Sequence, residues 1–481
     1  MRLLCAIAAL FLVWLFLVAP SSTGSALLAR AASASGEPWR YHIQSVVLEN
    51  DAGHLVQTHI DEQGSRVLTR RCMGIVCGGS IVDAATRRRA FFSYNETPIA
   101  QTEPLDARAV TLRAIVSYEF TSPQFAGTVI PKEPTHAGDR NVVPFAVTAP
   151  GGSTLDALLD PQSALLVGVA EDRRVLYLYD DEKRFGPLML PMRIRLPDQT
   201  DERFEERAVA GEPLAIPAGP PATFIADVPA TRMEGGDIPR FPCRVENVPL
   251  SCVLDTGAAG LAMSLGTADR LHKDPIGQIA LEGTGRILSG VVRADSLDLG
   301  SLRLGPALYA ILPDTGAFKA DVVVGADVVG KAVVRVDATR RTIRFDPPGS
   351  APDGAVVPLR FDGFMPSIPI VLESTPTELA VDTGDASSID LSATFVSEHP
   401  GVFVARRQER RGVAGVGGLG FQTPGTIPHV RFAGLSLRDV YAGSTDIPGS
   451  RAPSRVGAAF FSRFALSLDY TESRMSVREV R

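Results

Sequence analysis

The chain has 481 residues, of which 45% are hydrophobic and 21% charged, as in an ordinary globular protein that buries sizeable cores. Its formal net charge is −6 and no long run of one sign occurs, so the basic stripe that nucleic-acid binding needs is missing from the sequence. The length suggests several domains.

An apolar segment follows Arg2 at the N-terminus. Residues 3–19 read LLCAIAALFLVWLFLVA, and small and polar residues come next. These are the parts of a secretory signal, and Ala29-Arg30-Ala31 and Ala32-Ser33-Ala34 both fit its cleavage rule. We therefore expect residues 1–34 to be a signal peptide and the protein to be exported, to the periplasm or outside the cell. Because the apolar run is close to the shortest that spans a bilayer, an uncleaved N-terminal membrane anchor is the alternative.

Residues 38–200 contain many short segments rich in β-branched and aromatic residues, broken by Gly, Pro and Asp. Such segments, among them AVTLRAIVSYEF at 109–120, predict strands. We expect an all-β, sandwich-like N-terminal domain, and no motif within it indicates a role. A polar and Pro-rich stretch then predicts a linker over residues 201–221.

Four cysteines outside the N-terminal segment form two close pairs, Cys72 with Cys77 and Cys243 with Cys252. An oxidising compartment allows both pairs as local disulfides, and two pairs of reduced, half-buried thiols are the alternative. No His or further Cys lies near either pair at ligand spacing, so we expect no metal site, and no motif calls for a cofactor.

The region after residue 221 contains an internal repeat. RFPCRVENVPLSCVLDTG at 240–257 aligns with SIPIVLESTPTELAVDTG at 367–384, with the offset 382 − 255 = 127. A later segment beginning VGADVVG at 324 aligns with one beginning VGAAFFS at 456, with the offset 457 − 325 = 132. The repeat predicts two copies of one β-rich unit, at 222–348 and 352–481.

Three Asp-Thr-Gly tripeptides occur, and the repeat separates them. Asp255 and Asp382 occupy equivalent positions at the ends of buried-type strands, whereas Asp314 has no such counterpart. Asp314 follows Pro313, which argues against a central strand there, so we expect a loop turn. Two contacting carboxylates cannot both ionise easily, and the shared proton gives one base and one acid. Such a pair can activate a water molecule for peptide hydrolysis.

The C-terminal half resembles retropepsin-like and pepsin-like aspartic proteases. The resemblance rests on two apolar residues before each Asp-Thr-Gly, at 253–257 and 380–384, and on the later Val323-Val324-Gly325. It covers residues 222–481, and the fusion of two short units resembles bacterial exported aspartyl proteases with two retropepsin-like lobes. This implies two tandem β-barrel lobes related by a pseudo-twofold axis, a cleft for a polypeptide substrate, and a monomer that contains its own pseudo-dimer.

Carried over by position, the resemblance also implies roles for single residues. Asp255 and Asp382 would be the catalytic dyad of an aspartic endopeptidase. Thr256 and Thr383 would interlock beneath the dyad, Gly257 and Gly384 would line its floor, and Gly283, Thr284, Gly285, Gly417 and Gly418 would belong to two flaps over the cleft.

The second copy departs from the family pattern at two positions. Arg455 replaces the first apolar residue before Val456-Gly457, and Asp385 replaces the small or hydroxyl residue that usually follows the Gly. A charge beside Asp382 could raise the pKa of the dyad, distort it, bind a basic group of the substrate, or simply face solvent. A non-catalytic peptide-binding or scaffolding protein of the cell envelope is therefore the alternative to a protease.

Overall fold

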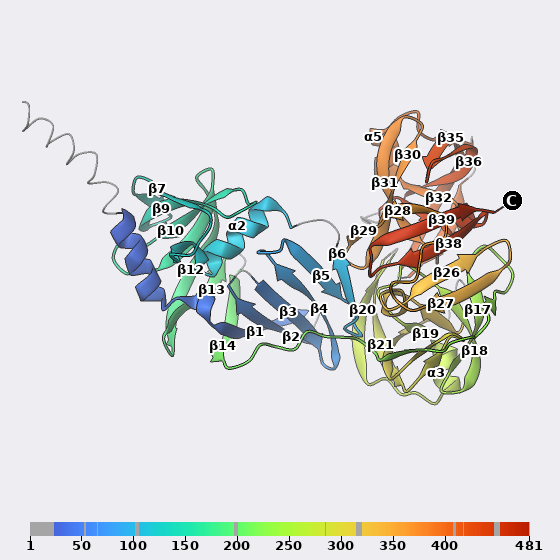
Figure 1. Ribbon diagram of the computed structural model, residues 1–481, viewed down its shortest axis with the longest axis horizontal. Helices are drawn as coiled ribbons and strands as arrows, with labels where there is room; N and C mark the ends of the chain where they lie inside the picture. The colour runs from blue at the N-terminus through green and yellow to red at the C-terminus, as the bar shows by residue number, and fades with distance from the viewer. Residues whose placement is uncertain are drawn as a thin grey trace, which may run out of the picture. The chain divides into compact units, whose positions relative to one another are not determined.

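The computed structural model describes residues 24–480, except 52–53, 65, 102–104, 197–200, 284, 314–319, 407–409, 417 and 447–452. Strands make up most of its regular structure, so the chain is mostly β (Figure 1). Most of the predicted signal segment and the Asp-Thr-Gly at 314–316 lie outside the described residues.

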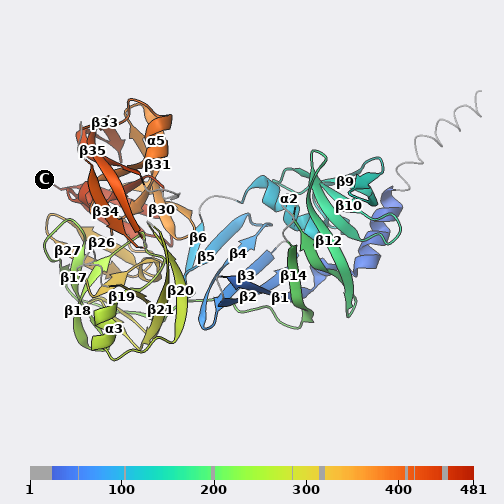
Figure 2. The same ribbon diagram turned by 180° about the vertical axis from the view of Figure 1, so that it is seen from behind.

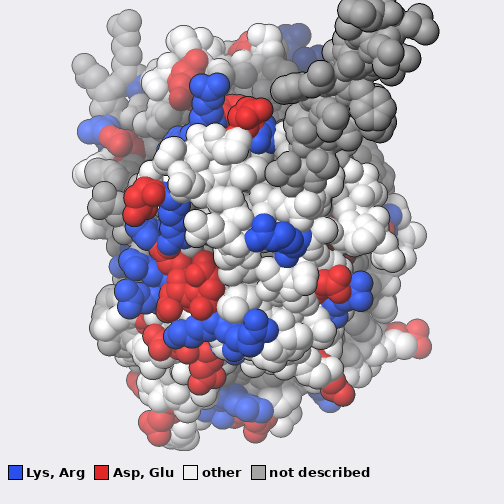
Figure 3. All heavy atoms as spheres, turned by 90° about the vertical axis from the view of Figure 1, so that its left-hand side faces the viewer, with Lys and Arg blue, Asp and Glu red and all other residues white. Residues whose placement is uncertain are grey.

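The chain divides into two compact units, which we describe separately. Unit 1 comprises Met1–Arg71, Ile81–Arg89 and Pro104–Ile216, and unit 2 comprises Cys72–Ser80, Ala90–Glu103 and Pro217–Arg481. Among the described residues, no helix combines the length and apolar character needed to cross a membrane. On the face shown in Figure 3, acidic and basic side chains are interspersed, and neither sign forms an extended patch.

Unit 1 is built on a meander of antiparallel strands. The sheet order is β3-β2-β1-β14-β13-β12-β11-β10-β9-β7, so most neighbours in the sheet are also neighbours in the chain. The strands are joined through β14 in one hydrogen-bonded order, and the sandwich-like arrangement stays a prediction. The elements are η1 (Pro38–Arg40), β1 (His42–Asp51), β2 (His54–Gln63), β3 (Arg66–Met73), η2 (Glu119–Thr121), β7 (Thr128–Pro131), β8 (Thr135–Ala137), β9 (Arg140–Thr148), β10 (Thr154–Leu159), β11 (Leu166–Glu171), β12 (Arg174–Phe185), β13 (Leu188–Arg195) and β14 (Asp201–Ala210).

The segment 109–120 is not the strand that its β-branched residues predicted. Helix α2 (Ala107–Val116) covers most of it and begins after Asp106, whose carboxylate accepts a hydrogen bond from the Arg108 N–H. Ala, Leu and Arg favour a helix, and the buried Val110 and Ala114 lie four residues apart on one helical face. Unit 1 is therefore mostly β, with this helix in place of one expected strand.

The stretch 201–221 is not a linker throughout. Its first half is β14, which pairs with β1 so that Ala210 lies opposite His42. Its charged residues suggested a linker, but Phe204 and Arg207 are buried, and Glu62 neutralises the Arg207 charge at an Nη2–Oε2 distance of 3.0 Å. Residues 211–221 contain neither helix nor strand.

A helix over residues 24–35 belongs to the core of unit 1. Leu27 and Ala31 are buried in the same apolar cluster as Phe145. The Arg30 guanidinium donates to the Gln162 carbonyl at 2.6 Å. Both candidate cleavage motifs therefore lie within a packed helix in this structure.

Unit 2 contains both copies of the repeat. The first copy holds β15 (Ala222–Phe224), β16 (Thr231–Arg232), β17 (Arg240–Val245), β18 (Val248–Leu254), β19 (Ala262–Ser264), α3 (Leu265–Arg270), β20 (Gly277–Glu282), β21 (Arg286–Ala294), β22 (Leu297–Asp298), β23 (Leu302–Leu304), β24 (Ala307–Leu312), β25 (Val322–Val324), α4 (Ala326–Val329), β26 (Val333–Asp337) and β27 (Thr342–Asp346). The second copy holds β28 (Ala355–Pro358), β29 (Arg360–Asp362), β30 (Met365–Leu372), β31 (Thr375–Asp382), β32 (Ile389–Ser392), α5 (Ala393–Glu398), β33 (Val404–Ala405), β34 (Arg411–Gly415), β35 (Gly418–Phe432), β36 (Leu435–Asp446), β37 (Arg455–Gly457), α6 (Ala458–Phe461), β38 (Phe464–Asp469) and β39 (Arg474–Glu479).

The two copies have the same strand pairing. In the first copy, β18 runs parallel to β25, and β19 runs antiparallel to β25 and parallel to β24. In the second copy, β31, β37, β32 and β36 repeat this pattern in the same order. The short helices match as well, since α4 and α6 begin 458 − 326 = 132 residues apart. The sequence repeat is thus also a repeat of topology.

One six-stranded sheet joins the copies, in the order β16-β27-β26-β38-β39-β28. Its central strands pair antiparallel, and Arg335 lies opposite Ser467. These two residues are repeat equivalents, since 467 − 335 = 132. One apolar cluster runs through both copies and includes the buried Phe345 and Phe432.

Two segments that precede the linker in sequence are part of unit 2, which changes the predicted boundary of the N-terminal domain. They are residues 72–80 and 90–103, and they contain parts of β4 (Val76–Asp83) and β5 (Arg88–Phe92) and all of β6 (Pro98–Gln101). Ile99 is 1% exposed within the main apolar cluster of unit 2. The predicted domain at 38–200 therefore supplies pieces of the C-terminal unit.

Candidate active site

Asp255 and Asp382 stand at the ends of equivalent strands, β18 and β31. The Asp255 N–H donates to the Val324 carbonyl at 3.0 Å, which ties this strand end to β25. Each carboxylate also accepts a hydrogen bond from its own turn. The Gly257 N–H donates to Asp255 Oδ1 at 2.8 Å, and the Gly384 N–H donates to Asp382 Oδ1 at 3.1 Å. Both carboxyl groups are therefore held by rigid backbone.

Thr256 and Thr383 interlock the two copies beneath these carboxyl groups. The Thr256 hydroxyl donates to the Val381 carbonyl at 2.6 Å and accepts from the Thr383 N–H at 3.0 Å. The Thr383 hydroxyl donates to the Leu254 carbonyl at 2.9 Å and accepts from the Thr256 N–H at 3.1 Å. Both side chains are buried, so water cannot replace these four bonds.

We expect Thr383→Val to destabilise unit 2 by about 2 kcal/mol, because it leaves a buried N–H and a buried carbonyl without partners. Thr383→Ser keeps the hydroxyl and should cost less than about 1 kcal/mol. Urea unfolding of both variants, followed by far-UV circular dichroism, measures the difference. Equal stability of the Val and Ser variants would show that the interlock carries no weight.

Gly257 and Gly384 allow the two carboxyl groups to approach each other. A Cβ atom at Gly257 would lie 2.8 Å from the Asp382 carboxyl carbon, and one at Gly384 would lie 2.4 Å from that of Asp255. Each glycine thus faces the carboxyl group of the other copy. The two carboxyl groups are therefore close enough for each to act on the pKa of the other.

The two carboxyl groups have raised pKa values. Burial raises the pKa of Asp255 well above its ordinary value, and the negative charge of Asp382 and the hydrogen bond to it act in the same direction. Burial also raises the pKa of Asp382, but the Arg455 guanidinium opposes this rise and the Asp385 carboxylate adds to it. Both shifts have the direction that favours one shared proton on the pair.

Residues 241–328 match the family model described as Aspartyl protease. The matched region contains Asp255 and ends 382 − 328 = 54 residues before Asp382. No curated protein matches the chain. The sequence match therefore supports an aspartyl protease domain in the first copy, and the second copy is related to it by the internal repeat.

Two glycine-bearing hairpins, one from each copy, meet at their tips (Figure 2). They are β20–β21 and β34–β35, and the Gly285 N–H of the first donates to the Val416 carbonyl of the second at 3.0 Å. Val416 and Leu281 belong to one apolar cluster with Ala258, which directly follows the Asp-Thr-Gly of the aspartyl protease region. Of the flap candidates, Gly283, Gly285 and Gly418 lie at these tips, and Thr284 and Gly417 lie outside the described residues.

A buried acid that the sequence did not single out, Asp327, organises the loop after the first Asp-Thr-Gly. Its carboxylate accepts hydrogen bonds from the Leu261 N–H at 2.9 Å, from the Asn95 amide at 2.6 Å and from the Ser93 hydroxyl. The Tyr94 hydroxyl donates to the Leu261 carbonyl. The segment 90–103 therefore supports the loop that follows the first Asp-Thr-Gly, through its contacts with Asp327 and Leu261. The repeat held one signal of this, because the second copy has Ala459 where the first has Asp327.

The structure contains both local disulfides. Cys243–Cys252 joins the paired strands β17 and β18, the second of which leads to Asp255. Cys72–Cys77 closes the turn between β3 and β4. Within the described ranges, no group of three or more His, Cys, Asp or Glu side chains is arranged to hold a metal ion.

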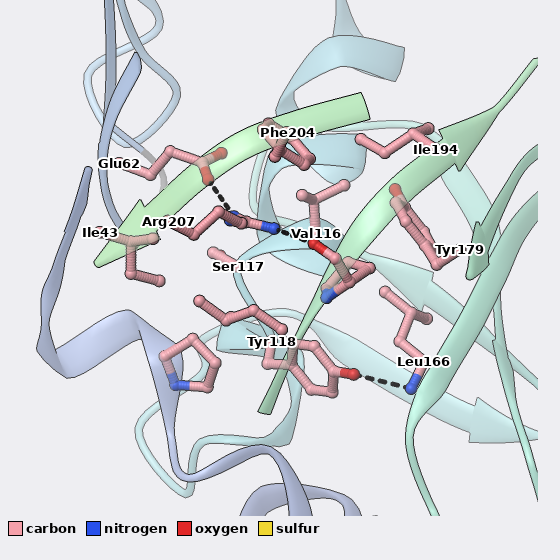
Figure 4. A pocket seen from close by; sticks show the side chains of 14 residues that line it. Ile43, Glu62, Val116, Ser117, Tyr118, Leu166, Tyr179, Ile194, Phe204 and Arg207 are labelled. Carbon is pink, nitrogen blue, oxygen red and sulfur yellow. Dashed lines mark hydrogen bonds and ion pairs between the residues drawn. The ribbon is translucent and has the colours of Figure 1, made fainter. Parts of the chain in front are cut away.

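Unit 1 contains a cavity of about 50 Å³ (Figure 4). Arg207 lies in its wall and donates to Ser45 Oγ, to the Pro191 carbonyl and to Glu62. Each guanidinium nitrogen therefore has a partner, and the space has room for only a few water molecules. These features indicate a structural ion pair and not a second catalytic site.

Proposed function

We propose that the protein is an aspartic endopeptidase whose site is formed by Asp255 from one copy and Asp382 from the other. The observation that carries this proposal is that each carboxyl group lies against the Asp-Thr-Gly turn of the other copy, above the interlocked threonines. In each copy, a glycine leaves the space that the carboxyl group of the other copy occupies. A repeated turn with a purely structural role would not need this space. The family match of the first copy supports the same class of reaction.

The proposal includes two retropepsin-like lobes related by a pseudo-twofold axis. Three residue pairs support it, because each joins a residue to its own repeat equivalent: Thr256 with Thr383, Arg335 with Ser467, and the two aspartates. Contacts between equivalent positions are what a twofold relation produces. On this account the chain is a monomer that contains its own pseudo-dimer.

The chemistry follows from one proton on the pair. The ionised carboxylate accepts a proton from a water molecule as the water oxygen attacks the peptide carbonyl carbon. The protonated carboxyl group donates its proton to the carbonyl oxygen, which gives a neutral tetrahedral diol. As the C–N bond breaks, the carboxyl group that took the water proton gives it to the nitrogen, and the other carboxylate takes a proton from one hydroxyl of the diol. The fragments leave as an amine and a carboxylic acid, and the pair again holds one proton. Water is the only co-reactant, and no covalent enzyme intermediate forms.

The pH dependence of cleavage tests the proposal. The reaction needs one proton on the pair, so the rate should fall at low pH, where both carboxyl groups are protonated, and at high pH, where neither is. Because the pKa of Asp255 is raised well above its ordinary value, activity should persist above the pKa of an isolated carboxyl group, about 4. We expect a bell-shaped profile for fluorescently labelled casein between pH ~3 and ~8, unaffected by EDTA.

Absence of cleavage over this whole range would contradict the endopeptidase. In that case, binding of casein peptides by the same protein would favour the peptide-binding alternative.

The two hairpins that meet at Gly285 and Val416 are the proposed flaps over the bound polypeptide. Export to the periplasm or the cell exterior, with or without an N-terminal anchor, remains part of the proposal and depends on the apolar segment at 3–19.

A further inference from the structure

Three apolar positions of the first copy are occupied by charged residues in the second. Ala258, Ala262 and Val323 correspond to Asp385, Asp390 and Arg455, at the offsets 385 − 258 = 127, 390 − 262 = 128 and 455 − 323 = 132. We call Asp385, Asp390 and Arg455 the charged triad.

The triad forms one set of contacts around the Arg455 guanidinium. Its Nε lies 2.7 Å from Asp385 Oδ2, and its Nη2 donates to Asp390 Oδ2 at 3.1 Å. Its Nη1 lies 3.9 Å from Asp382 Oδ2. The Arg455 side chain is 22% exposed and that of Asp390 is 6% exposed, so water screens these interactions only in part. The Asp385 side chain therefore faces a cation in its own copy.

Asp390 is itself fixed from a third direction. Its Oδ1 accepts hydrogen bonds from the Gln422 amide at 3.1 Å and from the Thr445 hydroxyl. Gln422 and Thr445 lie opposite each other on β35 and β36, at the base of the β34–β35 hairpin. The carboxylates of Asp385 and Asp390 thus hold the guanidinium in place. Its remaining nitrogen, Nη1, faces Asp382.

We propose that Arg455 is a positioning residue that holds Asp382 as the carboxylate of the dyad and leaves the shared proton on Asp255. This inference rests on the proposed function. Among the described residues of the first copy, Val323 occupies the position equivalent to Arg455, and no cation acts on Asp255 as Arg455 acts on Asp382. The duplicated fold would give two nearly equal carboxyl groups, and the charged triad makes them unequal.

The groups that act on Asp382 come from several elements. Burial raises its pKa, Arg455 on β37 lowers it, and Asp385 in its own turn raises it. Asp255, which directly follows β18, acts on it from the other copy, and Asp390 on β32 acts through Arg455. The buried Tyr470 phenol is close enough for its own pKa to be raised by both dyad carboxylates. Of these groups, Arg455 is the one that favours the ionised form of Asp382 through its charge.

The test measures ionisation directly, so that it does not depend on catalysis. The full chain is labelled with ¹³C at the aspartate carboxyl carbons, and the signals of Asp255 and Asp382 are assigned from the Asp255→Asn and Asp382→Asn variants. In the wild-type chain, the Asp382 signal should titrate at lower pH than the Asp255 signal. In Arg455→Gln, the lower of the two titration steps should rise by about one pH unit or more, and Arg455→Lys should restore it to within about 0.5 unit.

A triple variant guards against misfolding of Arg455→Gln. Asp385→Ala, Asp390→Ala and Arg455→Val together reproduce the side chains of the first copy and leave no buried acid without a partner. The pH of the lower titration step should rise in this variant too. The rise should be smaller than in Arg455→Gln, because the Asp385 charge, which raises the pKa of Asp382, is also removed. An unchanged or lowered step in a folded variant would overturn the proposal, and so would a wild-type chain in which Asp255 titrates first.

Casein cleavage gives a separate readout. If the proposed function holds, the acid limb of the pH–rate profile should shift to higher pH in Arg455→Gln, by the same amount as the titration step. If casein is not cleaved by the wild-type chain at any pH, the endopeptidase is wrong, while the titration still decides whether Arg455 orders the two carboxyl groups.

Discussion

Asp255→Asn should abolish the cleavage of casein and leave the fold intact. The amide cannot provide the shared proton in the same way, and the loss of a positioned acid or base costs about 10²- to 10⁴-fold in rate. The amide keeps the shape of the carboxyl group and can still accept the Gly257 N–H. Asp314→Asn is the matched control, because Asp314 stands in an identical tripeptide with no counterpart in the repeat. We expect it to keep nearly full activity.

The same variant should be more stable than the wild-type chain at neutral pH. The pKa of Asp255 is raised above its value in the unfolded chain, so this group contributes stability while protonated and loses it as pH rises through the folded pKa. Asn carries no charge and does not incur this loss. The gain should disappear below pH ~4, where the aspartate is protonated in both states. Urea unfolding at two pH values checks this, and a variant that is less stable at both would contradict the burial of an ionisable pair.

Gly384→Ala should be nearly as damaging to activity, although it changes no chemical group of the dyad. The new Cβ would lie 2.4 Å from the Asp255 carboxyl carbon and 2.5 Å from its Oδ2. The carboxyl group must therefore move, and a shift of about 1 Å in a reacting group costs about 10²-fold in rate. Cleavage of casein at the pH optimum measures the effect.

Gly211→Ala is the control for this substitution. No atom lies within 4 Å of the position that its Cβ would take, and it stands outside unit 2. It should leave activity unchanged. If Gly384→Ala retained full activity, the carboxyl group of Asp255 would not lie against this glycine in the working protein.

The repeat explains how much of the site the sequence could predict. The repeat relates Asp255 to Asp382 by their positions in the sequence alone, without knowledge of any contact. The structure brings both residues together with Thr256 and Thr383. The sequence showed that Asp385 and Arg455 each depart from the family pattern, but it did not show that the two side chains contact each other. Asp385 and Arg455 are 70 residues apart in sequence, and only the parallel pairing of β31 with β37 brings them together.

Other features depended on tertiary contacts that periodicity does not report. The charged stretch at 201–210 looked like a linker because the partner that neutralises Arg207, Glu62, lies 145 residues away. The helix α2 looked like a strand because its buried face contains β-branched residues. The bracing of Asp327 by Ser93 and Asn95 joins residues from either side of the predicted linker.

The requirement for the second copy is the central claim, because the family match covers the first copy alone. Casein cleavage by Asp382→Asn, compared with Asp255→Asn in the same full-length chain, tests it most directly. If both aspartates form one proton-sharing pair, the two variants should lose activity to a similar degree, by about 10²-fold or more. If Asp382→Asn cleaves casein at close to the wild-type rate while Asp255→Asn is inactive, the two-copy site is wrong.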